Sequence, residues 1–163
     1  MPRSFEGERD ASRFRFAIVA SRFNDEIVSG LLDGALACLT RHGAKDDAIT
    51  LFRVPGAFEI PTAVRMLISR GGFDAIVALG CLVRGETPHF DHISSQVTRE
   101  LSRISVDAGF PVAFGVITCN TWEQAVARSS SGAGNKGWEA ALAAIEMASL
   151  GAQVSGLGSE EGP

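Results

Sequence analysis

The sequence has no long apolar run and no excess of positive charge. No run approaches the roughly 20 residues needed to span a bilayer, and the formal net charge is −4. A mildly acidic chain lacks the electrostatic footprint of a nucleic-acid-binding protein. Residues 1–10 contain no apolar stretch of the kind found in a secretory signal. We therefore expect a cytoplasmic protein that binds neither membranes nor nucleic acid.

Cysteine is scarce, and its spacing argues against two common uses. Cys38, Cys81 and Cys119 are odd in number and widely separated, and no Cys-x-x-Cys pair occurs. Neither a disulfide framework nor a thiolate zinc site is therefore expected, and reduced thiols fit a cytoplasmic location. The sequence also lacks an internal repeat and a Walker phosphate-binding motif.

Short apolar runs alternate with helical patterns along the chain. The apolar runs predict strands at residues 14–20, 49–54, 75–79 and 112–117. Apolar residues at helical spacing predict helices across residues 27–39, 93–108 and 138–148, and Pro61 lies early in a further helix. Residues 75–79 have no polar residue on either face, which is typical of a parallel strand covered on both sides.

Alternation of strands and helices predicts βαβ crossovers and a parallel sheet. We therefore expect an α/β domain over residues 13–153, a flavodoxin-like three-layer sandwich with a four-stranded parallel sheet flanked by helices. Residues 1–12 and 154–163 are polar or rich in Gly, Ser and Glu. Because such segments bury little apolar surface, both are predicted to be flexible tails.

Ligands of open parallel sheets bind beyond the carboxyl ends of the strands, so a site is expected in the segments after the predicted strands. Phe23 follows the first strand, where its ring can either stack on a planar heterocycle or close the end of the core. Asn24 is suited to cap the next helix. After the second strand, Gly56 permits a tight turn. Glu59 can either accept hydrogen bonds from sugar hydroxyls or place favourable charge in a helix first turn.

The segment after the third strand combines flexible backbone with a helix start. Gly85 and Thr87 lie where backbone N–H groups would be available to a phosphate. His89 is at or near the helix start, where a neutral imidazole can accept a proton near pH 7 and return it. A surface or capping role is the ordinary alternative for a lone histidine.

Metal binding is a rival use of the same segment. His89 and His92 are three residues apart, with Glu86 and Asp91 adjacent, and this spacing allows two ligands on one helical face. The pattern is not His-Glu-x-x-His, however, and no remote third ligand stands out. We therefore expect no metal.

The segment after the fourth strand predicts a helix start and an anion contact. Thr121 and Gln124 have the spacing of a capping box. Arg128 precedes a run rich in Ser and Gly, residues 129–136, and is suited either to clamp a phosphate or to act as a solvated cation at a helix end. The Gly-rich stretch 132–137 is a weak signal for anion binding by itself.

Together, in this order and spacing, these segments resemble the lumazine synthases from about Phe16 to Leu150. The motifs that carry the resemblance are Arg22-Phe-Asn24, Val54-Pro-Gly-Ala-Phe-Glu-Ile-Pro61, Ala78-Leu-Gly-Cys-Leu-Val-Arg-Gly-Glu-Thr-Pro-His-Phe90 and Ala133-Gly-Asn-Lys-Gly137. The third motif is highly specific. Small departures are Ser21, where Ala is more usual, Leu82 for a more usual Ile or Val, and Ser129 to Ser131.

The resemblance implies a transferase of riboflavin biosynthesis that condenses 5-amino-6-(D-ribitylamino)uracil with 3,4-dihydroxy-2-butanone 4-phosphate, without a cofactor. His89 would be the acid and base. The pyrimidine and its ribityl chain would be bound by Phe23, Ala57, Phe58, Glu59, Cys81, Leu82, Val83 and Phe114. The phosphate-bearing substrate would be bound by Gly85, Glu86, Thr87, Arg128 and Lys136.

The resemblance also implies a homo-oligomer, because Phe114, Arg128 and Lys136 would reach the site from a neighbouring subunit. The short loop after Arg128 is similar to that of members whose ring pentamers form icosahedral shells. Riboflavin synthase is an expected partner. The alternatives are a catalytically silent relative that binds a flavin or lumazine, a shell-forming protein, and, less favoured, a flavodoxin-like electron carrier.

Overall fold

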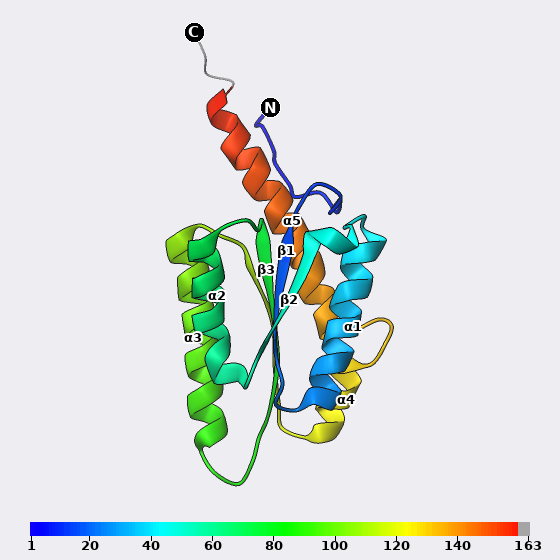
Figure 1. The fold of residues 1–163 in the computed structure, drawn as a ribbon, viewed down its shortest axis with the longest axis vertical. Helices are drawn as coiled ribbons and strands as arrows, with labels where there is room; N and C mark the ends of the chain where they lie inside the picture. The colour runs from blue at the N-terminus through cyan, green and yellow to red at the C-terminus, as the bar shows by residue number, and fades with distance from the viewer. Residues whose placement is uncertain (160–163) are drawn as a thin grey trace.

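The computed structural model describes residues 1–159, which form a four-stranded parallel sheet with helices on both faces (Figure 1). The strands lie in the order β2-β1-β3-β4. Their bounds are β1 Phe16–Ser21, β2 Ile49–Val54, β3 Ala75–Val83 and β4 Val112–Cys119. The predicted flavodoxin-like three-layer fold is confirmed.

Each face of the sheet has its own helical layer and its own apolar core. One layer contains α2 (Ile60–Arg70) and α3 (His89–Ala108). The other contains α1 (Asp25–Arg41), α4 (Trp122–Ser129) and α5 (Lys136–Gly156). Three short 3₁₀ helices complete the described chain: η1 (Asp46–Ala48), η2 (Ala57–Glu59) and η3 (Leu157–Ser159). No helix within residues 1–159 is long and apolar enough to cross a membrane.

The central strand β3 is longer than its apolar run predicts, since it continues past Leu79 to Val83. The glycine that interrupts the run, Gly80, is part of the strand and not its end. A Cβ atom at this position would lie 3.1 Å from Ile60 Cδ1 of α2, so the missing side chain lets α2 approach the sheet. Beyond Leu79, β3 pairs with β4 alone.

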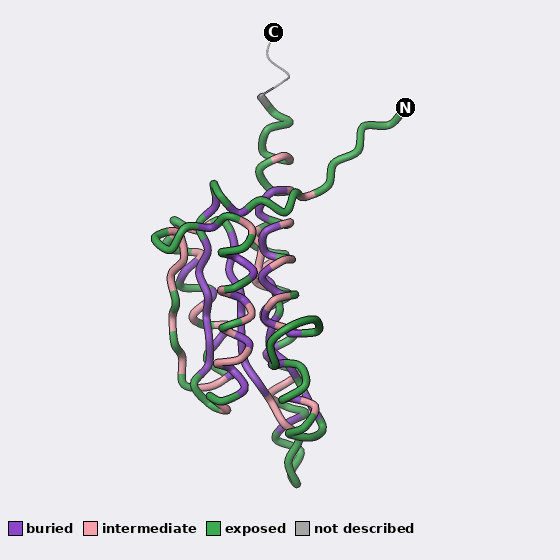
Figure 2. Tube along the Cα trace, turned by 90° about the vertical axis from the view of Figure 1, so that its right-hand side faces the viewer, coloured by how far each residue is buried: buried purple, intermediate pink, exposed green. Residues whose placement is uncertain are grey.

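Part of each predicted tail is associated with α5. Residues of the N-terminal segment contact this helix, and the first residues of the C-terminal segment belong to it. Near the N-terminus, Glu8 N donates to Ser149 Oγ (2.9 Å) and Arg9 pairs with Glu146 (2.7 Å). Ala11 is fully buried. Figures 1 and 2 show this segment beside α5, at the end of the molecule opposite the carboxyl edge of the sheet. Helix α5 itself continues to Gly156, and residues 160–163 lie outside the described part of the chain.

The hydroxyl of Ser21 is a polar atom buried in the apolar core between the sheet and α2. Ser21 is 1% exposed, and its Oγ is the single buried side-chain nitrogen or oxygen in residues 1–159 without a hydrogen-bond partner. It lies beside Gly80, near Ile60 and Val116. An unsatisfied buried hydroxyl destabilises the folded state by its lost hydration.

Ser21→Ala should therefore raise the free energy of unfolding by about 1 kcal/mol. Ser149→Ala is the matched control: this serine is equally buried, but its Oγ accepts the Glu8 N–H, so its loss should lower stability. Thermal or denaturant unfolding measures both. A fall in stability for Ser21→Ala would mean that its hydroxyl has a partner in solution.

Candidate active site at the carboxyl edge of the sheet

The exit of β1 is tied to the exit of β2, and this fixes Phe23. The backbone N–H of Arg22 donates to Val54 O (2.8 Å), and that of Phe23 donates to Pro55 O (3.1 Å). Phe23 is left 67% exposed. A solvent-exposed aromatic side chain on a backbone fixed by hydrogen bonds is suited to contact a ligand.

Asn24 occupies the predicted cap position of α1, but its side chain does not cap the helix. Its backbone is in the left-handed region (φ 57°), and its Nδ2 donates instead to Cys81 O at 3.0 Å. The hydrogen bond links the start of α1 to the extended part of β3. The prediction of side-chain capping by Asn24 was therefore wrong.

A pocket of about 370 Å³ opens where β3 has separated from β1. It is lined by Phe23, Gly56, Ala57, Phe58, Glu59, Leu82, Val83, Gly85, Thr87, His89, Phe90 and Ile93. Nine of these are residues that the sequence predicts for the site. Phe58 is 60% exposed, so two accessible aromatic residues border the opening. We call this cavity the aromatic pocket.

Glu59 is held in the aromatic pocket by its own turn. Gly56 N donates to Glu59 Oε2 (3.0 Å), and Glu59 N donates to Gly56 O (3.3 Å). Gly56 was expected to permit a tight turn. Its backbone is extended instead (φ −147°), a conformation that any residue can adopt. The carboxylate keeps further lone pairs for hydroxyl donors. At the start of η2, the amides of Ala57 and Phe58 have no partner within the helix.

His89 is the first residue of α3 and is exposed at the pocket. Pro88 precedes it, and Pro88 O accepts the N–H groups of Asp91 (3.1 Å) and His92 (3.3 Å), which closes the first turn. Phe90, the next residue, is buried. Phe90 and Ile93 also line the pocket, although the sequence analysis did not place them in the site. The i, i+4 spacing of His89 and Ile93 is the signal that could have found Ile93.

A second pocket, of about 350 Å³, lies along the free edge of β4 and the start of α5. It contains Phe114, Arg128 and Lys136, and we call it the cationic pocket. Phe114 is 47% exposed. Lys136 Nζ is 2.8 Å from Glu139 Oε2, and Arg128 donates to the carbonyl of Gln124 at 3.1 Å. The predicted Thr121–Gln124 capping box, which starts the helix that carries Arg128, is confirmed.

The two pockets share no lining residue among the described residues. Within one protomer, Arg128 and Lys136 therefore do not meet Phe23 and His89. Glu86 is exposed in the loop before α3 and lines neither pocket.

Cys81 was predicted to line the pyrimidine pocket, but its side chain points into the core of the α1, α4 and α5 layer and is 2% exposed. Burial raises the pKa of its thiol to about 12, so the thiol stays protonated near neutral pH. The misplacement has a simple cause, because β3 continues through this residue and side chains alternate along a strand. No group of three His, Cys, Asp or Glu side chains in residues 1–159 is arranged to hold a metal ion.

The cationic pocket depends on a buried amide between α4 and α5. Asn135 is 2% exposed, and its Nδ2 donates to the carbonyls of Gly30, Ser129 and Ser130, each at 3.1 Å. Its Oδ1 accepts from Trp138 N at 3.0 Å, which caps α5. This one side chain fixes the end of the helix that carries Arg128 against the start of the helix that carries Lys136.

The fold and these two pockets define a flavodoxin-like α/β protein with a candidate ligand site at the carboxyl edge of its sheet. The family model of 6,7-dimethyl-8-ribityllumazine synthase matches residues 13–152. A 6,7-dimethyl-8-ribityllumazine synthase from Aquifex aeolicus is 51% identical over 90% of this chain and 95% of its own. A 6,7-dimethyl-8-ribityllumazine synthase from Chlorobaculum tepidum is 49% identical over 93% of this chain and 97% of its own. The chain belongs to the 6,7-dimethyl-8-ribityllumazine synthase family, which confirms the resemblance seen in the sequence.

Asn135→Asp should lower the free energy of unfolding by about 2 kcal/mol or more, because it removes a buried donor and places a carboxylate against three carbonyls. Gln153→Glu is the control, an amide-to-acid change near the end of α5 where the side chain donates to Glu6 O. It should change stability little. Equal unfolding midpoints for the two variants would contradict the role assigned to Asn135.

Proposed function

We propose that this protein condenses 5-amino-6-(D-ribitylamino)uracil with 3,4-dihydroxy-2-butanone 4-phosphate to give 6,7-dimethyl-8-ribityllumazine, phosphate and water, in riboflavin biosynthesis. Family membership supports the reaction. The observation that carries the proposal is the aromatic pocket, which combines an exposed ring at Phe23, a carboxylate at Glu59 and an imidazole at His89. These are the groups needed for a planar ring, a polyhydroxyl chain and proton transfer.

In this proposal the pyrimidine stacks on Phe23, between Leu82, Val83 and the η2 turn. The ribityl hydroxyls bond to Glu59 and to the free amides that open η2. The phosphate-bearing substrate lies toward the loop before α3, where the backbone N–H groups of residues 85–87 and the first turn of the helix favour an anion.

The chemistry consists of condensation, elimination and ring closure. The 5-amino group attacks the ketone to give a carbinolamine, which loses water to form an imine. Loss of the C3 proton and of phosphate from C4 then gives an enol, which tautomerises to a new carbonyl at C3 and a methyl group at C4. The ribityl-bearing nitrogen attacks this new carbonyl and closes the ring with loss of a second water. Each step moves a proton, and His89 is placed to take protons up and return them. Because electrons stay within the two substrates, the balance needs no external oxidant or reductant.

A neighbouring subunit completes the site in this proposal. Phosphate-bearing substrates need a cation, and the protomer keeps Arg128 and Lys136 in the cationic pocket, away from the aromatic pocket. Cyclic association of identical subunits brings one protomer's cationic pocket to the next protomer's aromatic pocket. From the resemblance to the family, we propose that this ring is a pentamer.

The loop between α4 and α5 is short, residues 130–135, so it leaves room for pentamers to pack against one another. We propose an icosahedral shell of pentamers, located in the cytoplasm, with riboflavin synthase as a partner. The domain that assembles is proposed to be residues 13–153.

The direct test of function is to mix the purified protein with both substrates and follow lumazine fluorescence. Formation of 6,7-dimethyl-8-ribityllumazine at a rate proportional to protein concentration supports catalysis. A protein that binds the pyrimidine but forms no product would be a silent relative, and that result would overturn the proposal.

Arg128→Ala should raise the KM for the phosphate-bearing substrate by about one to two decades, since a charge-assisted hydrogen bond contributes roughly 1.5–3 kcal/mol. The KM for the pyrimidine should change little. Phe23→Ala is the reciprocal variant and should chiefly weaken the pyrimidine. Steady-state kinetics with each substrate varied in turn measures both. An equal rise in the KM for both substrates in Arg128→Ala would assign Arg128 a structural role instead.

A further inference from the structure

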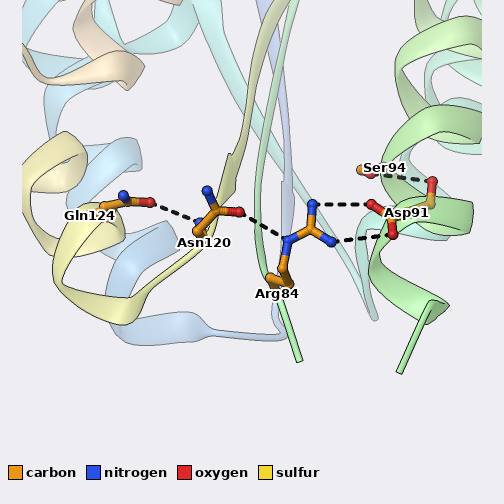
Figure 3. Close-up of polar contacts among 5 residues, drawn as sticks. All are labelled: Arg84, Asp91, Ser94, Asn120 and Gln124. Carbon is orange, nitrogen blue, oxygen red and sulfur yellow. Dashed lines mark hydrogen bonds and ion pairs between the residues drawn. The ribbon is translucent and has the colours of Figure 1, made fainter. Parts of the chain in front are cut away.

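Arg84 forms a clamp between the ends of two strands and the start of a helix (Figure 3). Its backbone N–H donates to Cys119 O at 2.8 Å, and its Nε donates to Asn120 Oδ1 at 3.0 Å. The guanidinium also meets both carboxylate oxygens of Asp91 in the first turn of α3, each at 3.2 Å. The guanidinium Cζ lies over the ring of Phe90, 4.6 Å from the ring centre.

The donors of Arg84 are directed at protein and not at either pocket. Nε serves Asn120 and both terminal nitrogens serve Asp91, and Arg84 lines neither the aromatic nor the cationic pocket. The Arg84 and Asp91 side chains are 46% and 58% exposed, and ion pairs at that exposure contribute little to the free energy of unfolding. The bidentate fork instead fixes direction, which a guanidinium does better than an ammonium.

The clamp closes a loop that contributes to the aromatic pocket. Residues 85–88 run from the end of β3 to the start of α3, and Arg84 and Asp91 join the two ends of this span. Gly85 and Thr87 within the loop, and His89 directly after it, line the pocket. The distance between the strand end and the helix start therefore depends on the Arg84–Asp91 contact.

The same contacts continue to α4 and the cationic pocket. Asn120 N donates to Gln124 Oε1 at 2.8 Å, and Gln124 O accepts from Arg128 at 3.1 Å. Figure 3 shows the line of side chains from Gln124 through Asn120 and Arg84 to Asp91. Both anion-binding elements of the protomer are thus anchored at the joined ends of β3 and β4.

We propose that Arg84 is a positioning residue, which through Asp91 holds the loop of residues 85–88 and His89 in the geometry that binds the phosphate-bearing substrate. This inference rests on the proposed function. It distinguishes Arg84 from Arg128, because Arg84 acts through another side chain whereas Arg128 is proposed to touch the phosphate.

The test compares Arg84→Met, Asp91→Asn and the double variant by steady-state kinetics. Each single variant should raise the KM for the phosphate-bearing substrate by about tenfold, because small misplacements of binding groups are costly. The KM for the pyrimidine should change less than about twofold in each single variant. The double variant should be no worse than Arg84→Met, because one contact is lost in all three.

Asp91→Asn separates this role from direct phosphate binding. If Arg84 contacted the phosphate, removal of its carboxylate partner would free the guanidinium and leave the phosphate-substrate KM unchanged or lower. That result would overturn the proposal, as would equal rises in both KM values. Arg84→Lys, which keeps the charge but loses the fork, should resemble Arg84→Met, and wild-type behaviour of Arg84→Lys would also overturn it.

Arg103→Met is the control, because Arg103 on α3 is similarly exposed and pairs with Glu100 (3.7 Å) and Asp107 (3.6 Å) outside both pockets. It should have wild-type kinetics. All variants should unfold near the wild-type midpoint. An inactive wild-type protein would contradict the proposed function. An active wild-type protein, with an unchanged KM for the phosphate-bearing substrate in Arg84→Met and Asp91→Asn, would contradict this inference alone.

Discussion

Strands β3 and β4 stay paired to Val83 and Cys119, four residues beyond the last pair that β3 makes with β1. This extension leaves one edge of β3 free at Leu82 and Val83. The exits of β1 and β2 fold toward that free edge and bring Phe23 and the η2 turn with them. The aromatic pocket exists because the β3–β4 pairing continues beyond the end of the β3–β1 pairing. The rest of the site depends on this difference in length.

The same pairing also keeps the two pockets apart. With β4 hydrogen-bonded along one edge of β3, Arg128 and Lys136 are confined to the far edge of the sheet, where β4 has no neighbouring strand in residues 1–159. Within one protomer, Arg128 and Lys136 therefore lie beyond the edge strand, and Phe23 lies on the other side of β3. In the function proposed above, closed association of identical chains brings the two pockets together.

Local sequence signals predicted the fold well and the site in part. The apolar runs located every strand, and the Thr121–Gln124 capping box located α4, because both depend on residues close in sequence. Gly80 misled the prediction of the length of β3, since its role is tertiary: it admits Ile60 of α2. The family resemblance assigned Cys81 to the pocket, whereas the continuation of β3 through this residue places its side chain in the core. Asn24 and Asn135 illustrate the same limit. Both precede helices and both fit the pattern of a helix cap, yet only Asn135 caps, while Asn24 donates across the sheet edge to Cys81 O. Whether the asparagine side chain caps its helix depends on which hydrogen-bond partner the folded chain brings near.

The clamp at Arg84 was missed for this reason too, because its partners Asp91 and Asn120 converge only when β3, β4 and α3 are assembled.

The central claim, that one active site is built from two protomers, is tested most directly by mixing two defective subunits. One variant carries Arg128→Ala, and the other carries Phe23→Ala with His89→Ala. Random co-assembly of equal amounts should leave about a quarter of the interfaces with two intact halves and restore about a quarter of wild-type activity. Activity no higher than the mean of the two variants assembled separately would contradict a shared site.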